Sequence, residues 1–320
     1  MAGFSSEVTE REWKEVTRTR APNRIVWIAL LALVGCDRTT NRESTAADGT
    51  GGIEVEVVGP GVISTELPEF ASAFSPDGDT IYFNRTPSDR SSIGLFYSVH
   101  TDSGWSESRP FPPTQGITAI DPFLSSDGRR LFFATPRVRE ISGNESLSIW
   151  FVERTHSGWS ELQEIGEPIN SDSTDYFLSL ATDGTVAFSS TRNGTLGIYI
   201  SSPSPSGWSD PELLTLEGAP DASNPLISPD GTLMVVSATS EDGSSDLMVA
   251  CRIEKGWSRP RALPDPVNSR FAEFAPAIAG DYLYYTSERP GIVGPSPDSI
   301  RPPGDLYRTP IRVLSDMCQP

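Results

Sequence analysis

The chain has 320 residues, of which 27 are glycine and 28 are proline, and its 43 acidic and 25 basic side chains give a formal net charge of −18. A strongly negative protein repels phosphate backbones, so nucleic acid is excluded as a partner. Stretches with helical apolar spacing are scarce after residue 35. Short β-rich runs separated by Gly, Pro, Asp and Ser clusters favour an all-β fold class instead.

The N-terminus carries an export pattern. Ten apolar residues, Ile25 to Val34, follow the basic residues Arg18, Arg20 and Arg24. Ten residues suit the apolar region of a signal peptide but are too few to span a bilayer. The motif at the end of this apolar segment, Leu-Val-Gly-Cys ending at Cys36, resembles the lipobox of bacterial lipoproteins. In that family the cysteine is lipidated and the peptide before it is removed.

This resemblance implies three parts: a lipoprotein signal peptide over 1–35, a lipidated Cys36 with a polar, flexible tether over 36–52, and a folded domain over 53–320. The protein is therefore expected in the exported bacterial cell envelope, anchored to a membrane by lipid and facing the periplasm. In lipoproteins of enteric bacteria, an aspartate in the position of Asp37 indicates inner-membrane retention, but the choice between inner and outer membrane stays open.

Two sequence markers recur about every 50 residues, a period typical of propeller blades or repeat arrays. The first is an Asp-Gly turn before an apolar strand, at Asp77, Asp127, Asp183, Asp230 and, in degenerate form, Asp281. The second is a Gly-Trp-Ser step, at Trp105, Trp159, Trp208 and Trp257. Both markers keep the same order, so they belong to one repeating unit.

Each unit is predicted to contain four strands, with the Asp-Gly pair in a hairpin turn of type I′ or a related type. A single such sheet cannot bury both faces, so the units must stack around an axis as a β-propeller. The repeated tryptophan is expected to fill the gap between adjacent blades.

The ends of the chain predict how the ring closes. The last unit lacks a Gly-Trp-Ser strand, whereas Ile53 to Phe70 aligns with Glu161 to Phe177 of an internal unit. An N-terminal strand that completes the C-terminal blade would remove the open sheet edges. We therefore expect about five four-stranded blades closed by an N-terminal strand, with six blades as the alternative.

Several motifs resemble the WD40-like, TolB-type propeller repeat of bacterial envelope proteins: the Ser-Pro-Asp-Gly turns, Thr286 to Gly291, and Gly304 to Tyr307. The resemblance implies a rigid interaction surface in the envelope. Together with the lipobox, it leads us to expect a non-catalytic scaffold that binds an envelope protein or a cell-wall component, as a monomer held at the membrane by its lipid anchor. Such a fold does not by itself define an activity.

Nucleophilic catalysis has little support in the sequence. The two histidines, His100 and His156, each precede a Gly-Trp-Ser turn and are expected to be exposed. Cys251 and Cys318 lack metal-ligand spacing; an oxidising compartment would permit a disulfide between them, but the sequence does not predict one. Neither a metal site nor a cofactor is predicted.

Acidic residues supply the rival function, that of a glycan-active enzyme. Glu69, Asp175 and Glu273 each lie eight residues before the turn aspartate of their unit, with Asp121 and Asp221 nearby. Two such carboxyl groups could flank a glycosidic bond at the mouth of the channel. Alternatively, these acids cap the inner strands and form ion pairs between blades with arginines that recur after the second strand. The channel-mouth binding candidates are therefore Glu69, Asp121, Asp175, Asp221, Glu273, Arg85, Arg192 and Arg289.

Overall fold

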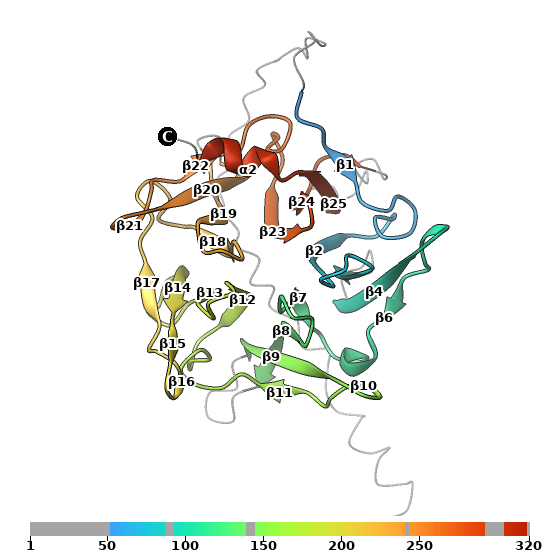
Figure 1. Cartoon of the computed structure of the whole chain (residues 1–320), viewed down its shortest axis with the longest axis horizontal. Coiled ribbons are helices and arrows are strands. Elements are labelled where there is room, and N and C mark those ends of the chain that lie inside the picture. The colour runs from blue at the N-terminus through green and yellow to red at the C-terminus, as the bar shows by residue number, and fades with distance from the viewer. Residues whose placement is uncertain (1–51, 87–92, 139–144, 241–242, 292–303, 319–320) are drawn as a thin grey trace, which may run out of the picture. The chain divides into compact units, whose positions relative to one another are not determined.

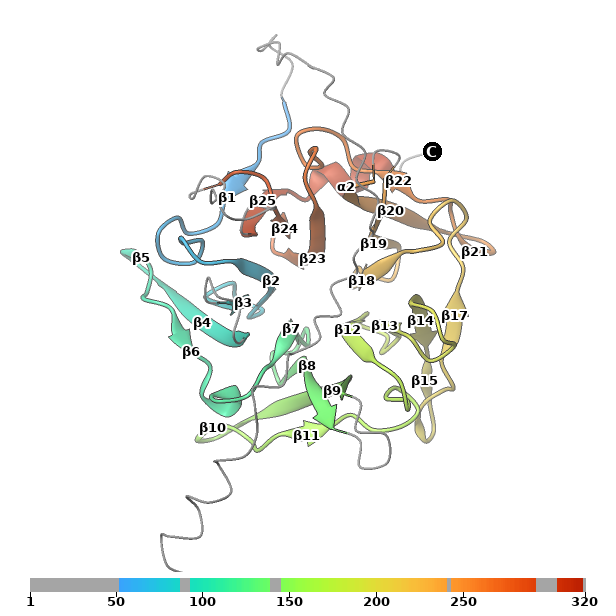
Figure 2. The ribbon, with the colours of Figure 1, turned by 180° about the vertical axis from the view of Figure 1, so that it is seen from behind.

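A computed structural model describes residues 52–86, 93–138, 145–240, 243–291 and 304–318. Five antiparallel sheets surround a common centre, and the first full-length strand of each sheet lies innermost (Figures 1 and 2). Neighbouring inner strands contact one another all the way around the ring. The predicted five-bladed β-propeller is confirmed.

The blades follow chain order. Blade 1 comprises β2 (Glu69–Phe74), β3 (Thr80–Arg85), β4 (Gly94–Thr101), β5 (Gly104–Trp105) and β6 (Arg109–Pro110). The 3-10 turn η1 (Pro112–Thr114) leads to blade 2, with β7 (Ile120–Leu124), β8 (Arg130–Val138), β9 (Glu145–Thr155), β10 (Gly158–Trp159) and β11 (Gln163–Glu164). Blade 3 comprises β12 (Asp175–Leu180), β13 (Val186–Ser190), β14 (Gly197–Ser201), β15 (Pro203–Ser204), β16 (Gly207–Trp208) and β17 (Glu212–Leu214).

The last two blades complete the ring. Blade 4 comprises β18 (Ser223–Ile227), β19 (Leu233–Thr239), β20 (Ser245–Ile253), β21 (Gly256–Trp257) and β22 (Arg261–Ala262). Blade 5 comprises β23 (Glu273–Ala279), β24 (Tyr282–Ser287), β25 (Asp305–Pro310) and, as its outer strand, β1 (Glu56–Val57).

The exchange of β1 closes the ring as predicted. β1 runs antiparallel to β25, with Val57 opposite Tyr307 and Glu56 opposite Arg308. The side chains of Glu56 and Arg308 form an ion pair across this seam. Blade 5 thus receives its fourth strand from the N-terminal side of the domain, and the alternative of six blades is wrong.

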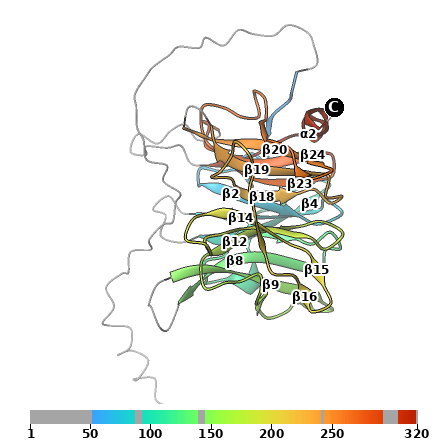
Figure 3. The same ribbon diagram turned by 90° about the vertical axis from the view of Figure 1, so that its left-hand side faces the viewer.

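Figure 3 shows the stacked strands of the blades from the side. Five apolar clusters fill the spaces between neighbouring blades. Between blades 1 and 2, Trp159 packs edge-on against Tyr82 at 6.2 Å and against Phe111 at 5.6 Å between ring centroids. Trp105, Trp208 and Trp257 pack against the corresponding clusters at three other junctions. The predicted role of the tryptophan as an inter-blade filler is confirmed.

The Asp-Gly turns adopt a related type rather than type I′ itself. Gly78 has a positive φ of 76°, but Asp77 does not, and the Gly78 N–H donates to the Ser75 carbonyl. This is the pattern of a type I turn followed by a left-handed glycine. The Asp77 carboxylate stabilises the turn by accepting from the Ser75 hydroxyl and the Asp79 N–H, and these bonds lower its pKa.

The C-terminus is joined to blade 4. Helix α2 (Arg312–Met317) buries Val313 and Leu314 in the cluster between blades 4 and 5. A disulfide then links Cys318 to Cys251 on β20, with 5.6 Å between their Cα atoms. The sequence spacing did not predict this pair, because only the return of the chain through α2 brings the two cysteines together.

The predicted signal peptide over 1–35, the lipidation site Cys36 and nearly all of the tether lie outside the described residues. Within the described ranges, no helix is long and apolar enough to cross a membrane.

Replacing Cys251 and Cys318 together by serine should lower the free energy of unfolding by about 2 to 4 kcal/mol, because the bridge closes a long loop in the unfolded chain. Urea unfolding of the oxidised protein and of the double variant would measure this difference. Reductant should destabilise the wild type and leave the double variant unchanged. Equal sensitivity of both proteins would contradict the bridge.

Candidate functional site

Three of the predicted acids belong to a repeated polar assembly, here called the clamp. In blade 3, Asp175 is the first residue of the inner strand. Its carboxylate forms an ion pair, at 3.0 Å, with Arg192, which follows the second strand. The N–H and hydroxyl of Ser171 both donate to this carboxylate, at 2.6 and 2.8 Å. Arg192 also donates to the carbonyls of Pro168 and Ile169 in the preceding connector. The clamp therefore fixes the connector to the start of the inner strand.

Blades 1 and 5 repeat the clamp. The carboxylate to arginine distance is 2.7 Å in blade 1 and 3.1 Å in blade 5. The members of the blade 1 clamp are Glu69, Arg85, Thr65, Val62 and Ile63. The members of the blade 5 clamp are Glu273, Arg289, Ser269, Pro266 and Val267. In each clamp the guanidinium lies over two aromatic rings, which are Phe83 and Phe96, Phe188 and Tyr199, and Tyr285 and Tyr307. The ion pairs form within a blade rather than between blades. Glu69 and Arg85 lie opposite each other in their hairpin. In blades 3 and 5 the acid lies opposite a serine, and the arginine follows that serine by two residues.

The clamp carboxylates are withdrawn from solvent. The side chains of Glu69, Asp175 and Glu273 are fully buried, and their arginines are mostly buried. Burial raises the pKa of Glu69, because desolvation outweighs the hydrogen bonds from Thr65 and the attraction of Arg85. Each carboxylate is occupied by donors of its own blade, so the clamp has a structural role.

Asp121 and Asp221 do not occupy clamp positions. The residues that correspond to the clamp acid in blades 2 and 4 are Ala119 and Ala222, as the pairing of the inner strands shows. Asp221, one residue before its alanine, accepts from the Thr239 N–H at 3.0 Å. Asp121, two residues after its alanine, stands in a different ring of residues.

That ring, here called the inner ring, consists of one residue per blade in the left-handed backbone region. Its members and their φ values are Ala71 at 46°, Asp121 at 56°, Phe177 at 49°, Asn224 at 49° and Ala275 at 51°. Each lies at a bulge where the inner strand changes register against the second strand. Positive φ is strained for Ala and Phe but better tolerated by Asp and Asn. Strain of this kind clusters at functional sites.

Neighbouring blades hold the inner ring in place. Asn84 of blade 1 accepts from the Asp121 N–H at 2.9 Å and donates to the Ala119 carbonyl at 2.7 Å. Thr286 and Ser189 accept in the same way from the N–H groups of Ala71 and Asn224. The backbone of Asp121 is therefore fixed by a side chain from the preceding blade.

The Asp121 carboxyl group has no such support. Its residue is only 9% exposed, and no described donor or cation contacts its side chain. Burial raises the pKa of Asp121 to about 7, with no compensating charge. The same carboxylate contributes, after burial, to the raised pKa of Tyr176 on the adjacent blade. Buried, unpaired carboxyls of this kind mark candidate functional sites.

Aromatic side chains from three of the five blades line the inner ring. Ala71, Phe177 and Ala275 form an apolar cluster, and the half-buried rings of Phe70, Tyr176 and Phe274 pack against it. We call these three rings the aromatic rim. Because the cluster joins blade 3 to blades 1 and 5, it spans the centre of the propeller. Asp121 and Asn224 occupy the inner-ring positions on either side of Phe177.

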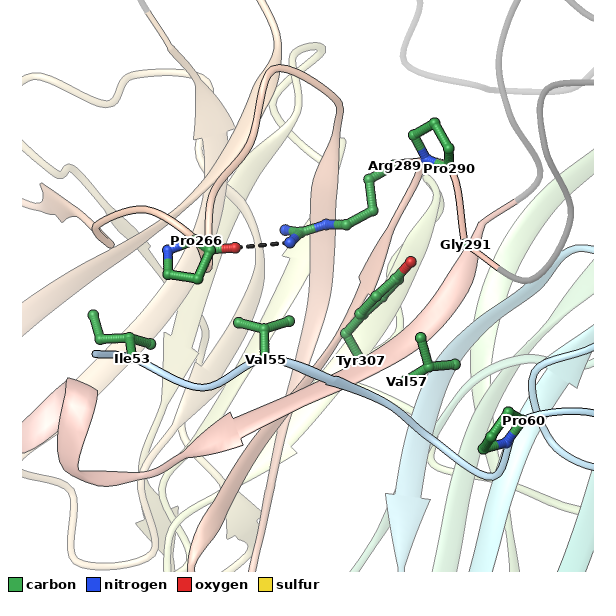
Figure 4. A pocket seen from close by; sticks show the side chains of 9 residues that line it. All are labelled: Ile53, Val55, Val57, Pro60, Pro266, Arg289, Pro290, Gly291 and Tyr307. Carbon is green, nitrogen blue, oxygen red and sulfur yellow. Dashed lines mark hydrogen bonds between the residues drawn. The ribbon is translucent and has the colours of Figure 1, made fainter. Parts of the chain in front are cut away.

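Two grooves lie away from this centre. Figure 4 shows the larger, of about 770 Å³, where Ile53, Val55 and Val57 face Tyr307 and the clamp arginine of blade 5. The other, of about 380 Å³, lies beside Arg85 and Phe96 in blade 1. Both are largely apolar, and the arginine in each is already neutralised by its clamp acid.

Sequence reasoning missed the aromatic rim, Asn224 and the Ser or Thr of each clamp. A signal for most of them was present. An aromatic residue follows each clamp acid, and Ser or Thr precedes each acid by four residues, as in Ser171 and Asp175. The sequence indicates Asp121 as a candidate, but it does not indicate that Asp121 lies two residues beyond the clamp position. His100 and His156 are exposed, as predicted.

The fold and topology place this chain among the five-bladed β-propellers, and solved structures similar to it include TolB-type proteins. TolB from Acinetobacter baumannii is 15% identical, with 78% of this chain and 55% of that chain covered and a TM-score of 0.45. The chain thus spans about half of that protein. The α-L-arabinofuranosidase PaAbf62A from Podospora anserina, solved with cellotriose, is 13% identical over 79% of this chain and 95% of that chain, with a TM-score of 0.50.

A gluconolactonase from Xanthomonas campestris is also similar, at 12% identity, with 81% of this chain and 90% of that chain covered and a TM-score of 0.45. These likenesses concern the fold alone. No protein-family model matches the sequence, and no curated protein sequence matches it.

Asp175→Asn should lower the free energy of unfolding by about 3 to 5 kcal/mol, because it leaves Arg192 mostly buried without its counter-charge. Asp210→Asn is the matched control, since Asp210 is exposed in the same blade, and it should change stability by less than about 0.5 kcal/mol. Urea unfolding measures both variants. Equal effects would show that the clamp does not stabilise the blade.

Asp121→Asn should gain stability relative to the wild type as the pH rises. Folded Asp121 keeps its proton up to about pH 7, whereas the unfolded chain releases it near 3.8, so the wild type loses stability across this window. The difference should grow to about 4 kcal/mol, at 1.36 kcal/mol for each pKa unit, and then level off.

Unfolding curves at several pH values would measure this difference. Asp281→Asn, at an exposed aspartate, should show no such trend. A difference between Asp121→Asn and wild type that is constant from pH 4 to 8 would contradict a protonated Asp121 at neutral pH.

Proposed function

We propose that this protein is a non-catalytic, lipid-anchored propeller of the bacterial cell envelope that binds an envelope protein or a cell-wall component as a monomer. The observation that carries the non-catalytic part is the state of the five candidate acids. Glu69, Asp175 and Glu273 are neutralised in clamps, and Asp221 accepts a backbone hydrogen bond. Only Asp121 among these five is without a described partner.

Glycoside hydrolysis normally requires two carboxyl groups that cooperate, one protonated and one ionised, on either side of the glycosidic bond. A clamp acid could join Asp121 in this task only by giving up its arginine and its Ser or Thr donors. The fold likeness to an arabinofuranosidase does not supply the second carboxyl group. This reasoning favours a binding scaffold over a glycan-active enzyme.

The envelope location rests on two separate features. The lipobox-like step ends at Cys36, after an apolar segment of signal-peptide length. The disulfide between Cys251 and Cys318 is typical of proteins that fold in an oxidising compartment outside the cytosol. Both features support export, and the first supports the anchor.

Metabolic labelling with palmitate in a bacterial host should mark the wild type and fail to mark Cys36→Ala, because the cysteine thiol and the new N-terminus receive the acyl chains. The double variant Cys251→Ala/Cys318→Ala is the matched control and should remain labelled. It separates attachment at Cys36 from attachment at any other cysteine. Equal labelling of wild type and Cys36→Ala would rule out the anchor.

A hydrolysis assay tests whether the protein is non-catalytic. Purified wild type incubated with peptidoglycan and arabinoxylan should release no reducing sugar. Release by the wild type that Asp121→Asn abolishes would instead establish the glycan-active alternative.

A further inference from the structure

The centre of the ring has two chemically different sides. Blades 5 and 1 contribute Phe274 and Phe70 to the aromatic rim, next to the alanines of the inner ring. Blades 2, 3 and 4 contribute the polar groups of Asp121, Tyr176 and Asn224, and blade 3 also contributes Phe177 to the apolar cluster. An apolar surface therefore meets a polar one that carries a single carboxyl group.

Among the described side chains, no cation pairs with Asp121. The strands packed against β7 carry these ionisable residues: Glu69 on β2, Tyr82 and Arg85 on β3, Tyr97 and His100 on β4, Arg130 and Arg137 on β8, and Asp175 and Tyr176 on β12. Glu69 and Asp175 are paired with Arg85 and Arg192, while Arg130 on β8 pairs with Glu153 and is exposed. Arg85, Arg130 and Arg192 are thus each paired with a carboxylate other than that of Asp121.

We propose that the centre of the ring, formed by Asp121, Tyr176 and the rings of Phe70 and Phe274, binds the ammonium group of an organic ligand. This inference rests on the proposed binding function and names its ligand class. A carboxylate shielded from water attracts a cation more strongly than an exposed one does. Aromatic faces attract the same cations through their quadrupoles.

Two further observations favour an organic cation. The net charge of −18 raises the local concentration of cations around the protein. A divalent metal would need several ligands, and the described residues hold no group of three or more His, Cys, Asp or Glu side chains suited to one. A single carboxylate beside aromatic rings suits an ammonium group on an apolar body.

The binding equilibrium is coupled to the protonation of Asp121. The ammonium group binds the carboxylate more tightly than it binds the neutral acid, so its binding releases a proton from Asp121 near neutral pH. Reciprocally, the ligand lowers the pKa of Asp121. This coupling provides a readout that a purely structural aspartate would not show.

The test is carbon-13 NMR of the full-length protein labelled in its aspartate side chains, with Asp121 assigned from the resonance missing in Asp121→Asn. The probes are benzylamine and its neutral analogue benzyl alcohol, at equal ionic strength. Saturating benzylamine should lower the Asp121 titration midpoint by about one unit, which corresponds to about tenfold tighter binding to the carboxylate than to the acid. Benzyl alcohol and sodium chloride should leave it unchanged, and Asp281 serves as the internal control.

An Asp121 midpoint that benzylamine does not move, or that benzyl alcohol moves equally, would overturn the inference. So would a midpoint near the ordinary value for aspartate, because the carboxyl would then not be shielded. These outcomes leave palmitate labelling of Cys36 and the hydrolysis assay unaffected. Failure of the ligand assignment is therefore distinguishable from failure of the proposed function.

Discussion

The burial of both faces of every sheet is the constraint on which this structure depends. Each apolar cluster is shared between two neighbouring blades, so no blade is complete without the next one. An open row of such blades would leave apolar faces exposed at its ends. The pairing of Val57 with Tyr307 removes those ends, and the central arrangement of inner strands exists only because the ring is closed.

The acidic residues around the centre are of two kinds. The clamp acids carry out structural work, since each one joins a connector, an inner strand and a second strand through one arginine. Asp121 lies only a short distance along the same kind of strand, but its side chain has no donor among the described residues. The clamp acids recur in three blades and stabilise the fold, whereas a buried acid without a partner occurs at one inner-ring position. Asp121 is therefore the acid to examine for binding.

Much of the architecture could be predicted from the sequence because its signals are periodic. The Asp-Gly and Gly-Trp-Ser markers locate the hairpins, and the alignment of Ile53 to Phe70 with an internal unit predicts the exchanged strand. The bulge that places Asp121 and Asn224 in the inner ring could not be predicted, because one extra residue changes the facing of a strand without any change in composition. The disulfide was equally hidden, since Cys318 reaches Cys251 only through the packing of α2.

The distribution of clamps has a consequence for the seam. Blades with and without a clamp alternate along the chain, but an odd number of blades cannot alternate around a circle. Blades 5 and 1 are therefore neighbours of the same kind, and they meet where chain connectivity alone would leave a break. Arg85 holds Val62 and Ile63 from one side, while Ser64 bonds to Leu306 on the other. The clamp of blade 1 and the bond from Ser64 thus hold the segment that joins the first and last blades from both sides.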